Sequence, residues 1–580
     1  MNRFKTLFLF LLMLSSVLSA RETRITLAVT SDVHGALFPY DFLNDTPGLS
    51  SMASVHTFTD SVRSIPGSNL ILLDNGDLIQ GTPAAYHANF VSRSRKNLFS
   101  SILNYMGYDA ATVGNHDIEA GRPVYERLRE EFNFPWLGAN IIDRASGEPA
   151  FKPYTVVERE GIRVAVLGLI TPGVPNWLPE SLWPGLEFRE LTASARFWVK
   201  HILEKEQPHA VIGLLHTGMG NPDLSPGDGM AENAGHWVAQ HVPGLDVIIL
   251  GHDHRPRAEK VVNTEGKEVQ IINPGSSANS IGFCELVFLR NTNGTADLQQ
   301  VSASIMTLRN TLPDKEYLRK FAGEIRNIRR YAAKKAGYLE APLAAREGLF
   351  GSSAFTDLVH QVQMEATSAP ISITAPLSVN QNLEAGKIAI RDFFKLYRYE
   401  NFLYVMELSG KEVKDFLEYS FSLWFNTMKS PDDHLLNFRK DENGLEVMTN
   451  GRLSLAHPSF NFDSAAGIRY EVDVSKPAGN RVTITGFENG NPFEETVTYR
   501  VAVNSYRGSG GGGHLTTGAG IDHDRIKDRI AETLEKDIRS LLMEYFRKHR
   551  NVNPTARNNW KVVPADWAES GKQKALDNGF

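Results

Sequence analysis

Five short polar segments, each directly after a run of apolar residues, constrain this chain more than any other feature. They are DVH at 32–34, GD at 76–77, GNHD at 114–117, His216 and GHDH at 251–254. The preceding runs have the length and composition of buried strands, and strand ends in layered α/β folds meet along one edge. The pattern therefore predicts that all five segments lie together at the strand ends of one α/β domain.

The side chains in these segments are those that a pair of divalent metals needs, because Asp and Asn supply oxygen ligands and His supplies nitrogen. Asp32 and His34 are two residues apart, as are His252 and His254, so each pair can face one side of an extended chain. Taken alone, a D-x-H or N-H-D segment is more often a turn or a cap, and an isolated histidine such as His216 is more often a structural polar residue, whereas His-x-His after a strand is moderately specific. Their joint occurrence favours a metal site.

We expect Asp77 to bridge the two metals. The first metal would be held by Asp32, His34, Asp77 and His254, and the second by Asp77, Asn115, His216 and His252. Two divalent ions beside two carboxylates leave a net positive charge, which a phosphate can complement. Zinc, manganese, cobalt and iron all suit these ligands.

His116 stands beside a predicted ligand and is itself a candidate catalytic residue. Glu119 follows three residues later, and a carboxylate there would orient the imidazole and keep it protonated. His116 would then donate to a phosphate oxygen or to the leaving oxygen.

The amino terminus predicts export. Basic residues at 3 and 5 precede the apolar run LFLFLLML at 7–14, and small residues lie at 15–20, as in a secretory signal. The run is shorter than the ~20 residues of a membrane span, although an uncleaved anchor is the alternative. The only cysteine, Cys284, excludes an internal disulfide and lies in an apolar run. We expect a bacterial protein that is periplasmic or secreted.

At 580 residues the chain exceeds one ordinary core, so we expect several domains. We predict a signal at 1–20, an α/β domain at 21–310, a linker helix at 311–338, a second domain at 339–550 and an irregular tail at 551–580. Strands are expected at 25–30, 70–73, 110–113, 163–170, 210–215, 247–250 and 269–272, then at 402–408, 469–474, 482–487 and 498–504. Helices are expected at 96–106, 123–132, 192–206, 411–422 and 526–548.

The sequence resembles the calcineurin-like metallophosphoesterases. The matching runs are TSDVHG at 30–35, DNGDLIQGTP at 74–83, GNHD at 114–117, LLHTG at 214–218 and GHDH at 251–254. Its second domain is similar to the bacterial 2′,3′-cyclic-nucleotide 2′-phosphodiesterase/3′-nucleotidases in SFNFDSAAGIRYEVDV at 459–474, NSYRGSGGGGH at 504–514 and NNWKVVP at 558–564. The resemblance implies a four-layer α/β/β/α domain followed by a mixed α+β nucleoside-binding domain.

The resemblance also implies that a nucleoside base is held between two aromatic rings, which map to Phe460 and Tyr506. Stacking on aromatic rings contributes about 1–3 kcal/mol per base and tolerates different bases. The alternative is that Phe460 or its same-face neighbour Phe462 is a core residue, and the sequence alone does not choose between them.

Two departures from the 5′-nucleotidase pattern bear on the substrate. Gly512 stands where that group has an Asp for the ribose hydroxyls, and the stretch at 373–378 lacks its phosphate-binding Arg. Both favour phosphate on the 2′,3′ edge of the ribose. In addition, Glu119 replaces the usual Asp partner of His116.

We therefore expect a hydrolase that opens 2′,3′-cyclic nucleotides and then dephosphorylates 3′-nucleotides. Its partners would be small-molecule nucleotides and not polynucleotides, since the net charge is −6, and we expect a monomer. The alternatives are a 5′-nucleotidase or nucleotide-sugar hydrolase, a sulfur-oxidation hydrolase, and a non-catalytic nucleotide-binding surface protein.

Overall fold

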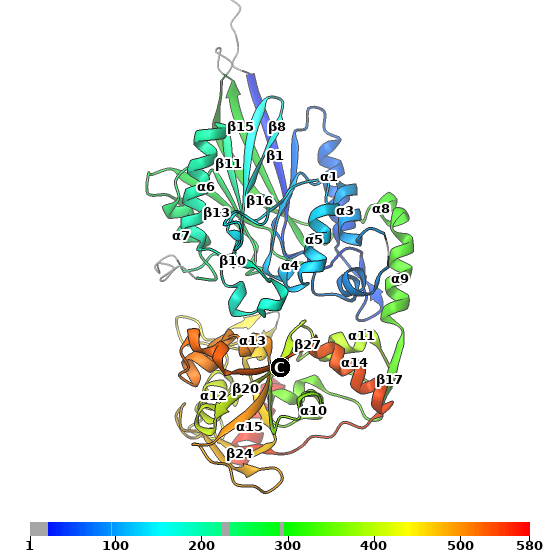
Figure 1. The fold of residues 1–580 in the computed structure, drawn as a ribbon, viewed down its shortest axis with the longest axis vertical. Helices are drawn as coiled ribbons and strands as arrows, with labels where there is room; N and C mark the ends of the chain where they lie inside the picture. Colours follow the sequence, from blue (N-terminus) through cyan, green and yellow to red (C-terminus); the bar gives the residue numbers. More distant parts are fainter. Residues whose placement is uncertain (1–20, 94, 222–230, 291–294, 450) are drawn as a thin grey trace, which may run out of the picture.

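The protein consists of two layered halves that lie one above the other (Figure 1). The computed structural model describes residues 21–93, 95–221, 231–290, 295–449 and 451–580, so the signal predicted at 1–20 lies outside the described residues. Helices α8 (Lys315–Lys320) and α9 (Ala322–Ala332) run down one side from the first half to the second.

Two six-stranded sheets form the first half. The first has the order β16 (Ala296–Thr307), β15 (Ser280–Arg290), β1 (Arg21–Thr30), β4 (Leu70–Asp74), β5 (Ala110–Thr112) and β6 (Trp136–Leu137). The second has the order β13 (Arg257–Val262), β14 (Glu268–Asn273), β12 (Val247–Leu250), β11 (Ala210–His216), β9 (Ile162–Ile170) and β8 (Tyr154–Arg159). The central strands of each sheet are parallel, which explains why they read as unbroken apolar runs.

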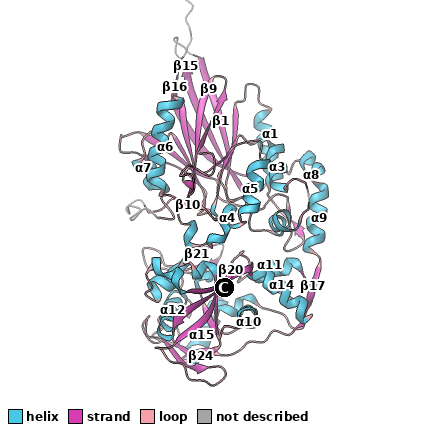
Figure 2. Cartoon of the chain, viewed as in Figure 1, coloured by secondary structure: helices cyan, strands magenta, loops and turns pink. Residues whose placement is uncertain are grey.

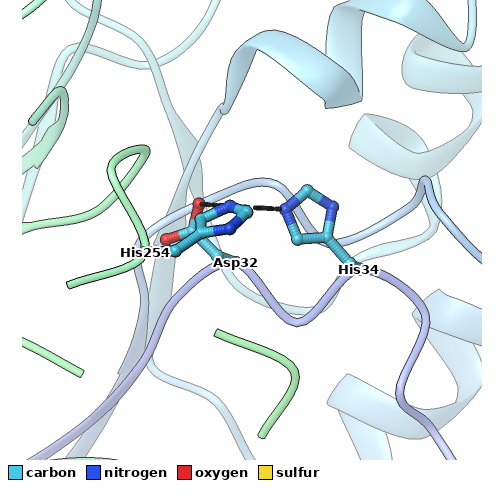
Figure 3. Close-up of side chains that lie close together, drawn as sticks. All are labelled: Asp32, His34 and His254. Carbon is cyan, nitrogen blue, oxygen red and sulfur yellow. Dashed lines mark hydrogen bonds and ion pairs between the residues drawn. The ribbon is translucent and has the colours of Figure 1, made fainter. Parts of the chain in front are cut away.

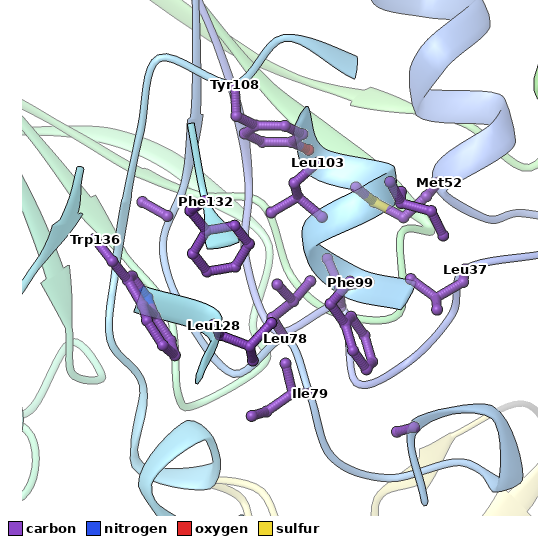
Figure 4. Packing of buried hydrophobic residues seen from close by; sticks show 14 of the residues in the cluster. Leu37, Met52, Leu78, Ile79, Phe99, Leu103, Tyr108, Leu128, Phe132 and Trp136 are labelled. Carbon is purple, nitrogen blue, oxygen red and sulfur yellow. The ribbon is translucent and has the colours of Figure 1, made fainter. Parts of the chain in front are cut away.

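The two sheets pack face to face through residues such as Leu27, Ile71 and Ile212. Helices α1 (Met52–Arg63), α3 (Leu98–Met106) and α5 (Arg122–Glu131) cover the first sheet, and Figure 4 shows part of that apolar packing. Helices α6 (Leu191–Glu206) and α7 (Gly235–His241) cover the second. The predicted four-layer α/β/β/α architecture is confirmed.

The second half is mixed α+β, as predicted (Figure 2). Its five-stranded sheet has the order β23 (Ser464–Ala466), β18 (Ile371–Thr374), β26 (Thr498–Asn504), β20 (Phe402–Ser409) and β27 (Ile530–Asp537). A three-stranded sheet has the order β25 (Val482–Phe487), β24 (Ile468–Asp473) and β29 (Trp560–Val563). The main helices are α10 (Ala354–Thr367), α12 (Gly410–Trp424) and α14 (Ile538–His549).

Two predictions for the end of the chain were wrong. The helix expected at 526–548 begins only at Ile538, because the preceding residues form β27 and pair with β20. The tail expected to be irregular carries β29 and α15 (Ala565–Asp577), and the Trp560 ring stacks on Tyr470 at 5.8 Å. Both errors involve strands whose partners lie about a hundred residues away, which a local pattern does not reveal.

None of the helices in the described ranges is both long and apolar enough to cross a membrane.

Candidate metal centre

All five polar segments lie at the carboxyl ends of the central strands of the first half. Asp32 follows β1, Asp77 follows β4, and Asn115 opens the short helix α4 (Asn115–Glu119) after β5. His216 is the last residue of β11, and the GHDH segment at 251–254 follows β12. Parallel pairing within each sheet brings these ends to one edge, as the sequence predicted.

The first group of side chains is Asp32, His34 and His254 (Figure 3). The Nε2 atoms of the two histidines are 3.0 Å apart, and Asp32 Oδ1 lies 3.3 Å from His254 Nε2 and 4.0 Å from His34 Nε2. Asp32 is completely buried. Two imidazole nitrogens and a carboxylate oxygen thus converge in the manner of a metal site.

The second group is Asp77, His216 and His252, with Asn115 beside it. His216 Nε2 lies 3.1 Å from Asp77 Oδ2 and 3.2 Å from Asn115 Oδ1. The other ring nitrogen of His216 donates to the Asn75 carbonyl oxygen at 2.6 Å. That hydrogen bond fixes the tautomer and leaves Nε2 as the ligand atom, which is the usual arrangement around a metal-binding histidine.

The backbone at the two groups is strained. Five of the seven predicted ligands have left-handed φ values: Asp32 (50°), His34 (47°), Asp77 (55°), His252 (66°) and His254 (56°). Each such residue costs on the order of 1–3 kcal/mol, and this strain persists mainly at functional sites. The Gly114 backbone also lies so close to Asp77 that only glycine fits there, because a Cβ on Gly114 would lie 2.2 Å from Asp77 Oδ1.

The electrostatics suit cations. Burial opposes ionisation of Asp77, but the charges of His216 and His116 hold its pKa well below the ordinary value. Burial likewise opposes ionisation of Asp32, and the hydrogen bond with His254 lowers its pKa. Burial lowers the pKa of His34 to about 4, which leaves a neutral imidazole that can act as a ligand. Two buried carboxylates among convergent imidazoles fit a pair of divalent ions.

His116 and Glu119 form the predicted pair, since the Nδ1 atom of His116 contacts a Glu119 carboxylate oxygen. The longer side chain of Glu119 therefore reaches the imidazole. Burial lowers the pKa of His116, but the charges of Asp77 and Glu119 outweigh it and raise the pKa to about 10. The His116 amide also donates to Asp77 Oδ1 at 2.8 Å, which ties the pair to the predicted bridge.

A cavity of about 180 Å³ between the two halves connects the metal groups to the second half. From the first half it is lined by side chains that include His116, Trp177 and His252. From the second half it is lined by Tyr399, Phe460 and Tyr506, among others. We call this space the first cavity.

The structure separates Phe460 from Phe462. Phe462 is buried and its ring stacks on Trp424 at 5.3 Å, whereas Phe460 lines the first cavity. The centroids of Phe460 and Tyr506 are 6.4 Å apart, but their planes meet at 86°. The two rings are therefore neighbours, and a base can lie between two parallel faces only after one ring turns.

Arg507 ties together the two segments that carry these rings. Its Nη2 atom donates to the Phe460 carbonyl oxygen at 2.6 Å, and its Nε atom donates to Asp463 Oδ2 at 2.8 Å. The buried guanidinium also lies 5.2 Å from the Tyr506 ring centroid. The sequence analysis missed Arg507, although its place directly after Tyr506 was a usable signal.

Sequence reasoning missed other neighbours of the site. His252 Nε2 lies 2.7 Å from Glu232 Oε1, and the His252 ring stacks on Trp177 at 5.6 Å and 26°. The Asp117 carboxylate accepts hydrogen bonds from the amides of Asp77 and Gly114. Asp117 lies within the GNHD run and could have been proposed, whereas no local pattern marks Glu232 or Trp177.

Comparison with known families agrees with this geometry. Residues 25–256 match the calcineurin-like phosphoesterase family, and residues 332–518 match the 5′-nucleotidase C-terminal domain. The chain therefore carries a calcineurin-like phosphoesterase domain followed by a 5′-nucleotidase C-terminal domain. Calcineurin-like phosphoesterases use divalent metals, and the two groups of side chains in this phosphoesterase are the candidate places for them.

Several characterised relatives match this phosphoesterase over most of its length. The trifunctional nucleotide phosphoesterase protein YfkN of Bacillus subtilis is 27% identical over 94% of the chain, which spans 39% of that relative. The 2′,3′-cyclic-nucleotide 2′-phosphodiesterase/3′-nucleotidase of Yersinia enterocolitica is 26% identical, with 98% of this chain and 91% of that protein aligned.

Among solved structures, a putative 5′-nucleotidase from Staphylococcus aureus has the same fold as this phosphoesterase. The TM-score is 0.73 at 20% identity, and the match covers 93% of this chain and all of that one.

Proposed function

We propose that this phosphoesterase opens 2′,3′-cyclic nucleotides to 3′-nucleotides and dephosphorylates these to nucleosides. The observation that carries the proposal is the first cavity, which places the candidate metal groups and His116 opposite Phe460 and Tyr506. A nucleotide needs both chemistries, phosphate binding at one end and an aromatic surface at the other. Relatives of similar length that are named for this activity support the choice.

We propose the following ligand sets. Asp32, His34, Asp77 and His254 would hold one metal, and Asp77, Asn115, His216 and His252 would hold the other. When bound, two divalent cations polarise the phosphate and activate water near neutral pH. Zinc, manganese, cobalt and iron fit this mixture of nitrogen and oxygen ligands.

In this proposal His116 is the proton donor and Glu119 positions it. The contact between them orients the ring, and the raised pKa of His116, about 10, keeps the imidazole protonated at neutral pH. The proton would pass to the 2′ oxygen when the cyclic ester opens and to the 3′ oxygen when phosphate leaves.

Phe460 and Tyr506 would bind the base through their ring faces. Gly512 supports recognition of a phosphorylated 2′,3′ edge, because an Asp side chain does not fit there in the present arrangement. Gly512 has φ 72°, and a Cβ would lie 2.2 Å from Arg507 Nη1 and 2.7 Å from Asn461 Oδ1. Position 512 therefore carries no carboxylate that would repel a phosphate on the 2′,3′ edge.

A 5′-nucleotidase, or a related nucleotide-sugar hydrolase, is the second candidate. A protein named 5′-nucleotidase from Vibrio cholerae is 25% identical to this chain over 68% of its length. Against this candidate stand Gly512 and the stretch at 373–378, which contributes Leu377 and Ser378, but no Arg, to the cavities between the halves.

Phosphate release from 2′,3′-cyclic AMP, 3′-AMP and 5′-AMP would separate the two candidates. The metal-loaded protein would be assayed at steady state, with a separate phosphatase coupled to the cyclic substrate. We expect kcat/KM to be at least about tenfold higher for the first two substrates, which corresponds to ~1.4 kcal/mol. A preference for 5′-AMP would favour the second candidate instead.

We further propose that the protein is exported to the periplasm or secreted, and that it acts as a monomer. The basic residues and apolar run within positions 1–20 support export. Cell fractionation and sedimentation of the mature protein would test the two statements separately.

A further inference from the structure

A second cavity, of about 570 Å³, lies beside the first one between the two halves. The two cavities share Leu377, Tyr399 and Phe460 as lining residues. None of the predicted metal ligands lines the second cavity. It therefore adjoins the first cavity at Tyr399 and Phe460, and its lining also includes Gly81, where a Cβ would lie 3.2 Å from His34 Cβ.

The second cavity has the chemistry of an anion site. Arg398 is the one cationic residue among the described residues that line it, and its side chain is exposed. Its guanidinium makes no ion pair or hydrogen bond with any residue in the described ranges. The backbone there is fixed, since the Arg398 carbonyl oxygen accepts from Arg539 Nη2 at 2.7 Å. A planar guanidinium without a protein partner is well suited to a phosphate.

Among the described residues, the other walls are uncharged except for one carboxylate. Ser378, Gln381 and Ser459 contribute uncharged polar groups. The one carboxylate in the lining, Asp41, is already engaged: Oδ1 accepts from the Leu43 and Asn44 amides at 2.9 and 3.2 Å, and Oδ2 accepts from Asn44 Nδ2 at 2.7 Å.

The shape of the proposed substrate indicates which anion enters. This step rests on the proposed function, in which the 2′,3′ edge faces the metal groups and the base lies at Phe460 and Tyr506. The remaining substituent of the ribose is its 5′ carbon, and the second cavity, which adjoins the first at Tyr399 and Phe460, is the neighbouring space that this substituent can enter. The first cavity, at about 180 Å³, is also smaller than the ~300–1,000 Å³ typical of ligand pockets.

We propose that the second cavity is a subsite for a 5′-phosphate, with Arg398 as its main recognition residue. The enzyme would then accept nucleotides that carry phosphate on both edges, such as nucleoside 3′,5′-bisphosphates. Hydrolysis breaks the bond between phosphorus and the 3′ oxygen. Water supplies hydroxide to phosphorus, His116 passes its proton to the 3′ oxygen, and the proton released from water restores His116. The products are inorganic phosphate and a nucleoside 5′-monophosphate.

The test compares adenosine 3′,5′-bisphosphate with 3′-AMP as substrates of the metal-loaded, full-length mature protein. We expect the wild type to prefer the bisphosphate by about tenfold in kcat/KM, mainly through KM, as for a hydrogen-bonded charge pair. Arg398→Gln should bring the ratio near one while leaving kcat/KM for 3′-AMP unchanged, and Arg398→Lys should retain part of the preference. Arg309→Gln, an exposed arginine that lines neither cavity, is the matched control.

The outcomes are distinguishable. Equal ratios in the wild type and Arg398→Gln, or a wild type without a preference for the bisphosphate, would overturn the subsite while the proposed function stands. Failure to release phosphate from either substrate would overturn the proposed function and the subsite with it.

Discussion

The two sides of the first cavity differ in how far their side chains are already positioned to bind a ligand. On the side of the first half, the candidate ligands already converge, with histidine nitrogens 3.0 Å apart on strained backbone. On the side of the second half, Phe460 and Tyr506 are neighbours, but their planes are nearly perpendicular. The candidate metal ligands of the first half are thus preorganised, whereas the proposed base-binding rings of the second half must turn before a base can lie between parallel faces.

This difference has a physical origin. The candidate ligands lie at the ends of central parallel strands that are paired on both sides and packed between layers. Phe460 lies in a 3-10 turn (Ser459–Asn461) before β23, and Tyr506 lies in the short helix α13 (Ser505–Gly508) after β26. Arg507 holds the Phe460 backbone, while both rings stay half-buried. We therefore expect changes in the first half to affect every substrate, and changes in the second half to discriminate among substrates.

Asp77→Asn should give the largest effect. Asp77 contacts His216 and accepts the His116 amide, so the loss of its charge disturbs both candidate metal positions and the proton donor. We expect kcat to fall at least about 1,000-fold, for 3′-AMP and for bis(4-nitrophenyl) phosphate alike. Steady-state assays on both substrates would measure this, with the melting temperature as a control for folding. Retained turnover would remove Asp77 as the bridge.

Much of the first half was predictable because its signals are local. Each candidate ligand, such as Asp32 or His216, directly follows or ends its strand, so the strand pattern and the ligand type occur together in the sequence. Glu232 was not predictable, since it meets His252 only through the fold. On an extended chain Phe460 and Phe462 would share a face, but residues Ser459–Asn461 form a 3-10 turn, and the packing of Phe462 on Trp424 distinguishes the two rings.

Tyr506→Ala should separate the two sides of the cavity most clearly. Loss of one stacking surface should lower kcat/KM for 3′-AMP by about tenfold to a hundredfold, mainly through KM. Turnover of bis(4-nitrophenyl) phosphate, which has no nucleoside base, should change little, and Tyr506→Phe should behave as the wild type does. Equal losses on both substrates would contradict the base-binding role and the expectation that changes in the second half discriminate among substrates.

Glu232→Ala tests whether Glu232 positions the candidate metal ligand His252. Glu232 accepts the Nε2 hydrogen of His252 if His252 binds the metal through Nδ1, which is the usual pairing of a carboxylate with a metal-bound histidine. Its loss should weaken metal binding by about tenfold. Competition with a chelator for zinc or manganese would measure the affinity, and Glu265→Ala, at an exposed glutamate, is the control. Unchanged affinity would make the Glu232 contact incidental.

Substitution of His360 should give the smallest effect. It tests whether the stability of the second half depends on pH. It is buried, with Nδ1 3.0 Å from Ser372 Oγ and Nε2 3.3 Å from Ser464 Oγ. Burial lowers its pKa from 6.5 to about 3. Between these two pH values the unfolded chain binds the extra proton, so the free energy of unfolding falls as the pH falls.

The slope from this one group is at most about 1.4 kcal/mol per pH unit, and it vanishes above pH 6.5. Hydrogen exchange of the amides of β18, which carries Ser372, would report the stability of this half between pH 4 and 8. His360→Gln should flatten the dependence even if it lowers stability at pH 8, whereas the exposed His523→Gln should leave it unchanged. If the free energy of unfolding of His360→Gln has the same dependence on pH as that of the wild type, other groups make the second half acid-sensitive.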